Sequence, residues 1–317
     1  MVNRGANTSM ALINRRGFFF TIIIIAILSL VLFSSVFYSE VQERQAIQQR
    51  IKTMNAFLFS LEEDIERNMY IAGYRSLFLL EKKIIESGNF INNVNASVQE
   101  LFYNGTLDGV AQDIMIGAKF SDIETALRDK ARVINVNVSL TQPSFALLQD
   151  NPWKVKAVFS SQLLFVDMTG LATWNVSLEK TAVIPLNNFE DPLYIVYTNG
   201  QVPYKIVETP YSVFVQGNDV SNLTIHVEGH YYIASSLAPS FLDRLEGRFN
   251  ANPQGIESLA ELSALSAQGI STEAKSVVEY IYFSGNNPTS HQISGMPSWF
   301  RLDDAHLAVY NASHLSI

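Results

Sequence analysis

Residues 17–38, GFFFTIIIIAILSLVLFSSVFY, form an apolar stretch without one charged side chain. As an α-helix this stretch would extend roughly 33 Å at 1.5 Å per residue, which exceeds a hydrocarbon core of about 30 Å. A buried core helix would be shorter and would carry a polar face. A cleaved signal peptide would have a shorter apolar region and a small-x-small site after it. The stretch is therefore predicted to be a transmembrane helix, with the lipid bilayer as its partner.

The charges on either side of this stretch indicate its direction. Three arginines and no acidic residue precede it in residues 1–16, whereas two glutamates follow within five positions of its end. Loops rich in Lys and Arg stay in the cytoplasm. We therefore expect a single-pass protein of the cell membrane, with residues 1–16 as a cytoplasmic basic leader and residues 39–317 outside the cell.

The composition limits the partners and the chemistry of the outer part. The chain has a net charge of −8, and because residues 1–39 hold three of its 22 bases and no acid, the rest carries 30 acids against 19 bases. A region with this much negative charge would repel nucleic acid, so nucleic acid is excluded as a partner. The absence of cysteine excludes thiolate catalysis and Cys-ligated metal sites.

Residues 39–87 are predicted to continue the helix as an amphipathic stalk. Neither proline nor glycine occurs from residue 18 to residue 72. Apolar side chains recur there at spacings of three and four, close to a heptad pattern. Two explanations remain open: this seam packs on the protein's own globular part, or it packs on the same helix of neighbouring copies. The residues of the seam are Ile47, Ile51, Met54, Leu58, Leu61, Ile65 and Met69.

The sequence at the start of the apolar stretch, Arg15-Arg16-Gly17-Phe18, resembles the class III signal of archaeal type IV pilin-like proteins. The resemblance implies that a prepilin-type peptidase cuts between Gly17 and Phe18, and that copies of the chain or other pilin-like subunits are partners. A hydrophobic helix running into an amphipathic one and then a β-rich head is the pilin plan. Ile22 is a departure, since many pilins carry glutamate at this fifth mature position, so Glu-guided assembly is not implied.

This resemblance covers about the first 70 residues. The remainder, through residues 239–247 (PSFLDRLEG) and 295–306 (GMPSWFRLDDAH), is similar to uncharacterised membrane-anchored archaeal surface proteins, a similarity that implies no activity. A plain uncleaved signal anchor remains the alternative to pilin-like processing.

The outer part is predicted to be α+β, with a mainly antiparallel sandwich. Residues 88–216 would form a helical lead-in and a β-rich domain, and residues 217–317 a second β-rich part with a helical insert at 239–247 and 256–265. Alternation of apolar and polar residues from 134 to 140 and from 173 to 178 predicts half-buried strands. Further strands are expected near 154–166, 193–198, 211–216, 222–233, 276–283 and 305–310.

Asn-x-Ser/Thr sequons support an outside location. Asn7 lies in the predicted cytoplasmic leader. In two of the others the asparagine falls on the polar side of a predicted strand, where a sugar has room. We expect glycans at several of the six outer sites, which are Asn95, Asn104, Asn137, Asn175, Asn222 and Asn311.

The search for a chemical site gives one metal-ligating pattern, and no cofactor is implied. His226, Glu228 and His230 lie on a predicted strand, where alternate side chains share a face and neighbours lie roughly 6.8 Å apart. That spacing would let the three side chains converge on a metal, but Asn222 and Thr224 on the same face favour the simpler view of an exposed polar face. P-loop, GxGxxG, HExxH and GxSxG motifs do not occur.

Two further clusters each have a functional and a structural explanation. Asp303, Asp304 and His306 form either a base with its orienting acid or a capped turn. The aromatic residues are either a binding patch or core packing. They are Trp299, Phe300, Tyr280 and Tyr282.

The leading hypothesis is a membrane-anchored surface protein, a pilin-like structural or adhesive component of the cell envelope. The second is a single-pass anchored ectodomain that binds a solute or partner in an envelope complex. The third is an anchored metal-dependent hydrolase that uses the histidine pattern, although the chain is not expected to be an enzyme.

Overall fold

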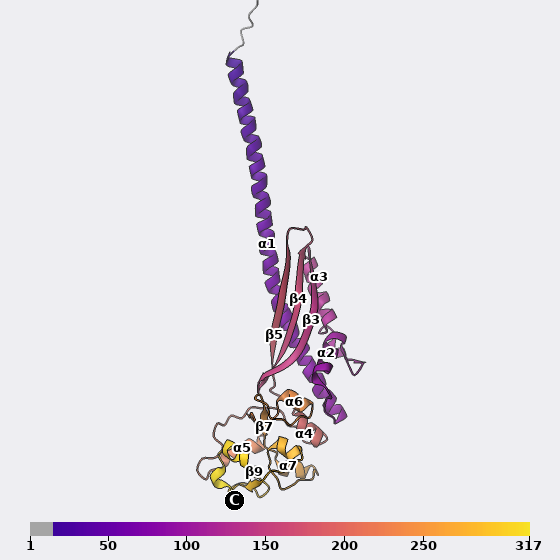
Figure 1. The fold of residues 1–317 in the computed structure, drawn as a ribbon, viewed down its shortest axis with the longest axis vertical. Helices are drawn as coiled ribbons and strands as arrows, with labels where there is room; N and C mark the ends of the chain where they lie inside the picture. The colour runs from indigo at the N-terminus through magenta and orange to yellow at the C-terminus, as the bar shows by residue number, and fades with distance from the viewer. Residues whose placement is uncertain (1–14) are drawn as a thin grey trace, which may run out of the picture. The chain divides into compact units, whose positions relative to one another are not determined.

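The computed structural model describes residues 15–317, and the chain divides into two compact units, Met1–Ser60 and Leu61–Ile317. Residues 1–14 of the predicted leader, which include the Asn7 sequon, lie outside the described residues. Helix α1, Arg15–Ser87, begins at the two arginines of the signal-like motif and belongs to both units. The prediction of one uninterrupted helix through the apolar stretch and the stalk is therefore confirmed (Figure 1).

The first unit is the apolar half of α1. Its large hydrophobic side chains from Phe18 to Tyr38 are 41–71% exposed. Among the described residues it is the one helix long and apolar enough to cross a membrane by length and composition. The apolar segment Phe18–Tyr38 therefore contributes no core to the protein.

The second unit begins with the rest of α1, which packs against its own domain. Leu61, Ile65 and Met69 of the heptad seam are buried within the chain. At Gly73 the helix comes so close to a sheet that an added Cβ would lie 2.7 Å from Ile184 Cδ1 and 2.8 Å from Ala157 Cβ. Of the two explanations for the seam, packing on the protein's own globular part is confirmed for these three positions.

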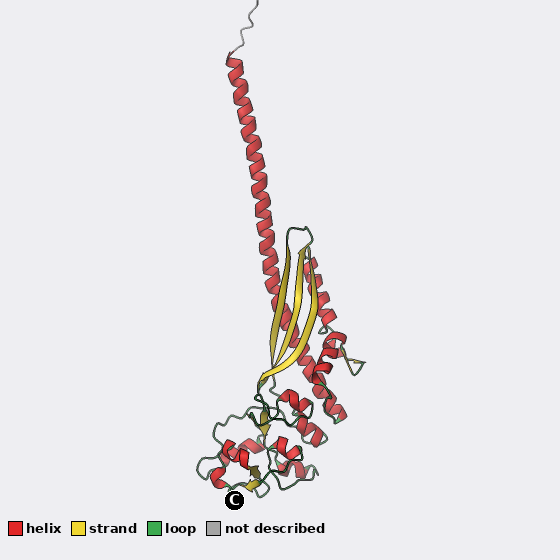
Figure 2. Cartoon of the chain, in the orientation of Figure 1, coloured by secondary structure: helices red, strands yellow, loops and turns green. Residues whose placement is uncertain are grey.

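The sheet beside α1 has three antiparallel strands in the order β3-β4-β5 (Figure 2). The strands are β3 (Val136–Asn151), β4 (Lys154–Asp167) and β5 (Thr173–Pro185). Side chains alternate along β3, where Val136, Val138 and Leu140 are buried and Asn137 is exposed, as their pattern predicted. The buried face of this sheet is the one that α1 covers.

Two further helices, α2 and α3, complete the cover of that face. They correspond to the helical lead-in that the sequence predicted. Phe102 of α2 stacks on Phe145 of β3 at 4.1 Å between ring centroids, and Phe120 of α3 lies 6.3 Å from Phe159 of β4. Asn93 caps the start of α2 by accepting a hydrogen bond from the Ala96 N–H. The segment comprises α2 (Val94–Asn104), β1 (Thr106–Leu107), β2 (Val110–Ala111), the 3₁₀ turn η1 (Asp113–Met115) and α3 (Phe120–Arg132).

The C-terminal part consists of short helices and two-stranded sheets around one hydrophobic core. The sheets are β6-β7 and β8-β9, both antiparallel. The elements are α4 (Pro192–Tyr197), α5 (Ser221–Glu228), β6 (Tyr232–Ala234), α6 (Phe241–Leu245), β7 (Ile256–Ser258), α7 (Leu262–Ala267), α8 (Glu279–Phe283), β8 (Ser290–Gln292), β9 (Arg301–Asp303), α9 (Asp304–Val309) and the 3₁₀ turn η2 (Ser313–Leu315).

The α+β class with antiparallel sheets is confirmed, but the predicted sandwich is not confirmed. The three-stranded sheet packs on helices, and each other sheet in residues 15–317 has two strands. Of the strands expected near 193–198, 276–283 and 305–310, each is a helix, and 211–216 is a loop. These runs are short and apolar on most sides, so they lack the periodicity that separates a buried helix from a strand. The helical insert at 239–247 is present as α6.

Candidate functional site

The predicted metal pattern does not converge, because its residues lie at the end of a helix. Residues 222–228 belong to α5, and positions two apart on a helix point about 200° apart. His226 is buried and its Nδ1 lies 3.1 Å from Thr209 Oγ1, whereas His230 Nε2 lies 3.1 Å from Glu261 Oε2. Glu228 is exposed. Across residues 15–317 no group of three metal-ligating side chains is placed to hold an ion.

The predicted acid and base do come together, but in an arrangement that suits structure rather than catalysis. His306 Nδ1 lies 2.7 Å from Asp303 Oδ1, while Asp304 is separate and lies 2.7 Å from His291 Nε2. Ser276 Oγ donates to Asp303 Oδ2 at 2.6 Å. The Ser276 hydroxyl thus meets the carboxylate and not the imidazole, so Ser276 is not placed for His306 to activate it as a nucleophile.

His306 belongs to a buried network of charges. Its Nε2 lies 3.1 Å from Tyr280 Oη and 3.3 Å from Glu257 Oε2. Burial by itself would lower the pKa of His306, but the hydrogen bonds with Asp303 and Glu257 raise it to about 10. Burial opposes ionisation of Asp303 too, and its bonds to His306 and Ser276 bring the pKa of Asp303 below its ordinary value. The imidazolium is therefore the stable form inside the protein at neutral pH.

Arg244 of α6 is the second buried cation, and the prediction from sequence did not identify it. Its guanidinium donates to Asp191 Oδ2 at 2.6 Å, and also to Glu279 Oε1 and the Ile256 carbonyl oxygen. Tyr232 Oη donates to the same Asp191 oxygen at 2.8 Å. Burial raises the pKa of Glu279 to about 7, although Arg244 acts in the opposite direction. These contacts join α4, α6, β7 and α8 into one core.

The aromatic residues that were a candidate binding patch contribute to this core. Phe300 is fully buried, and Tyr280 and Tyr282 are buried as well. Trp299 is partly buried and packs against the same hydrophobic cluster. Core packing is thus the correct explanation for this set.

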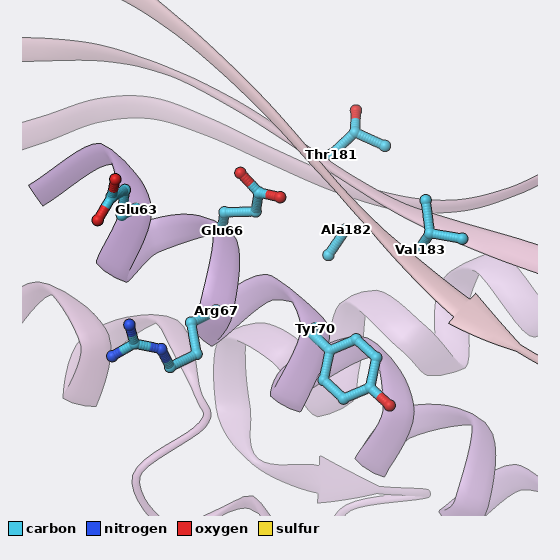
Figure 3. A pocket seen from close by; sticks show the side chains of 7 residues that line it. All are labelled: Glu63, Glu66, Arg67, Tyr70, Thr181, Ala182 and Val183. Carbon is cyan, nitrogen blue, oxygen red and sulfur yellow. The ribbon is translucent and has the colours of Figure 1, made fainter. Parts of the chain in front are cut away.

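An open groove lies between α1 and the edge strand β5, within the second unit (Figure 3). It measures about 600 Å³, and α1 and β5 form its two walls. Glu66 and Tyr70 stand on the α1 side, opposite Thr181 and Val183. The complete lining is Glu63, Glu66, Arg67, Tyr70, Thr181, Ala182 and Val183. The sequence carries no local signal for this groove, because its two walls are more than 100 residues apart.

A second, smaller hollow of about 350 Å³ uses the next turns of α1. Tyr74 and Phe78 line it, and Tyr74 is 6.2 Å from Tyr70 in a stacked arrangement. Residues 187–190, which follow β5, form the opposite wall together with Lys205. Along the α1 side of the two hollows, Glu63, Glu66 and Arg67 are followed by the rings of residues 70, 74 and 78, and Glu81 comes after them.

The predicted glycosylation sites are all accessible. The six sequon asparagines, whose positions are given above, are each exposed. Asn137 and Asn175 lie on the sheet face opposite α1, on β3 and β5. The proposed processing residues, Gly17 and Phe18, lie in the first turn of α1, where the Phe18 side chain is 62% exposed.

Comparison of the chain with protein-family models, with curated proteins and with solved structures gives no match.

Proposed function

We propose that this chain is a membrane-anchored surface protein on the pilin plan, a structural or adhesive component of the cell envelope. The observation that carries the proposal is the helix surface from Phe18 to Tyr38, which is apolar on every side and exposed. An apolar surface of that size in water is strongly unfavourable at about 25 cal/mol per Å², and it calls for lipid or other apolar helices as its surroundings.

The second unit supports a role in display. It presents accessible asparagines in six sequons, as a protein outside the cell would. The arginines before the apolar stretch favour a cytoplasmic N-terminus and an outer head. The buried charges lie in the core of the second unit, and the exposed surface of this unit is available for contact.

The arrangement of α1 supports the pilin plan in particular. One helix supplies both the apolar segment and, after residue 60, the helix against which an antiparallel sheet packs. The motif at residues 15–18 provides the expected processing site. In this proposal the mature chain begins at Phe18, and its apolar helix is held first by the bilayer and then by the helices of other subunits.

The test is the N-terminal residue of the protein purified from its native membranes. Chains that begin at Phe18 support pilin-like processing, and a Gly17→Trp variant should then keep its leader. Chains that begin at Met1 or Val2 contradict processing and leave a permanent anchor.

A permanent anchor would favour the second function, a single-pass ectodomain that binds a partner in an envelope complex. The groove between α1 and β5 is the specific observation in its favour. A membrane-bound chain that starts at Met1, with cells that form no filaments dependent on its gene, would make it the leading function. Filaments that disappear on deletion of the gene would contradict it.

A further inference from the structure

The groove beside α1 has an open strand edge as one of its walls. β5 is an outer strand of its sheet, and its pairing with β4 runs without a bulge from Thr173 to Pro185. No backbone group of β5 bonds to a segment other than β4 among the described residues. Every second residue of β5 therefore points its N–H and C=O away from β4. These unpaired groups are the ones to which an added strand would hydrogen-bond.

The opposite edge of the sheet, formed by β3, is unsuited to such pairing. A register shift between Thr141 and Ser144 interrupts β3, Gln142 has a positive φ of 52°, and Pro143 has no N–H to donate. Natural sheets use these devices to prevent edge pairing. β5 has no register shift and no positive φ, and its one proline, Pro185, stands at its last position, which distinguishes it from β3.

The α1 wall carries two carboxylates and one cation. Among the described residues, Glu63 and Glu66 form no ion pair, whereas their neighbours do: Glu62 bonds to Lys180 at 2.7 Å and Asp64 to Lys130 at 2.6 Å. Arg67, the cation in the lining, lies 3.3 Å from Asp64 and is 70% exposed. The groove thus keeps two negative charges that the chain itself does not neutralise.

The aromatic rings further along α1 add a surface that suits the same kind of ligand. Tyr70, Tyr74 and Phe78 follow one another at intervals of four and are 40–43% exposed. Ring faces of this kind attract the ammonium and guanidinium groups of Lys and Arg. Tyr70 lines the groove at β5 together with Glu63 and Glu66, so the carboxylates and this ring face along the strand edge both favour a basic chain.

We propose that β5 and the facing side of α1 bind an extended segment of a partner protein that carries basic side chains, as a fourth strand of the sheet. Main-chain bonds to β5 supply affinity, and alternate side chains of the segment point to Glu63, Glu66 and Tyr70 and supply specificity. The site lies wholly within residues 61–317, so it does not depend on how the chain is anchored or processed.

The test uses a fluorescent peptide, TKVKVKT, with blocked ends and the full-length chain in detergent micelles. Alternation places its lysines on one face of a strand. We expect saturable binding by fluorescence anisotropy, and protection of β5 amides from hydrogen exchange while β3 amides stay unchanged. Absence of binding at millimolar peptide, or protection on β3 instead, would overturn the proposal.

Two comparisons separate strand addition from simple charge attraction. A double variant, Glu63→Lys with Glu66→Lys, should weaken binding at least tenfold. The matched control is Glu40→Lys with Glu43→Lys, an exposed pair with the same spacing on the same helix, which should leave binding unchanged. A peptide N-methylated at alternate residues along one edge keeps its charge but loses its strand donors. Two such peptides, methylated on opposite edges, are compared. The peptide whose methylated edge faces β5 should bind at least tenfold more weakly. Equal binding by the two peptides would contradict the proposal.

Discussion

Individual residues in the C-terminal part show how this protein tolerates charge inside its core. Arg244 and its partners Asp191 and Glu279 have no solvent exposure. A buried ion pair gains little net stability because both charges lose their hydration, but loss of one partner leaves the other buried and uncompensated. Arg244 is difficult to replace even by lysine, since its planar guanidinium reaches four acceptors at once.

Arg244→Met should therefore lower the free energy of unfolding by about 3–5 kcal/mol. Arg248, which is 57% exposed and pairs with Asp243 and Glu246, is the matched control. Arg248→Met should cost about 0–1 kcal/mol, as expected for a surface pair. Urea unfolding followed by tryptophan fluorescence measures both variants. Equal effects would contradict the assignment of Arg244 as the central cation of the core.

The raised pKa of His306 leads us to expect a loss of stability in alkaline solution. Its pKa is raised to about 10 in the folded protein, against about 6.5 when unfolded. The stabilisation is complete below pH 6.5 and is lost as the pH rises toward 10, because over that range the folded state holds a proton that the unfolded state has released, so a rise in pH favours unfolding. The groups that face His306 are Asp303, Glu257 and Tyr280, with Glu279 and Tyr310 close behind them.

The measurement is the urea midpoint between pH 7 and pH 10. It should fall steadily in the native chain. His306→Gln should be less stable at pH 7 and show a flatter profile. The control is His314→Gln, since His314 is exposed and bonds to the Gly217 carbonyl oxygen, and it should keep the native slope. An unchanged slope in His306→Gln would show that other groups cause the alkaline loss.

Among the elements, α1 and the sheet depend on a close approach at Gly73. A valine there would place its Cβ less than 3 Å from Ile184 and Ala157. Overpacking of this kind costs about 1–3 kcal/mol, more than the helix propensity of the new residue returns. Gly73→Val should therefore be less stable by about 1–3 kcal/mol in thermal or urea unfolding. Lys82→Val, at an exposed position of the same helix, should cost less than about 1 kcal/mol. A neutral Gly73→Val would contradict the contact.

The elements differ in how far their sequences determine them. β3 and the long helix could be predicted because their periods are sustained over many residues. α4 was mistaken for a strand, since Leu193, Tyr194 and Ile195 are all buried and show no period of their own. The available signals were Asp191 as the cap and Pro192 at the first helical position, both of which favour a helix start.

The site was less predictable than the fold, because long-range packing creates it. The ion pair between Glu62 and Lys180 joins residues 118 positions apart, and the groove walls are equally distant in sequence. The histidine pattern failed for a local reason, since its geometry rested on a strand where the chain forms α5. Asp303 and His306 were correctly paired, but their burial and the placement of Ser276 give them a structural role.

At the scale of the whole molecule, the account requires the apolar half of α1 to lie in a membrane or among other helices, and the second unit to lie outside the cell. The chain contains no cysteine, so a single introduced thiol reports its location without background. Ser271 is suitable because it is exposed and lies outside every sequon.

The most direct test is the labelling of Ser271→Cys with a membrane-impermeant maleimide, on intact cells and on lysed cells. We expect equal labelling in both, in a protein that stays in the membrane fraction after alkaline carbonate washing. Labelling that occurs only after lysis would place the second unit in the cytoplasm and contradict the central claim, and so would release of the protein by the carbonate wash.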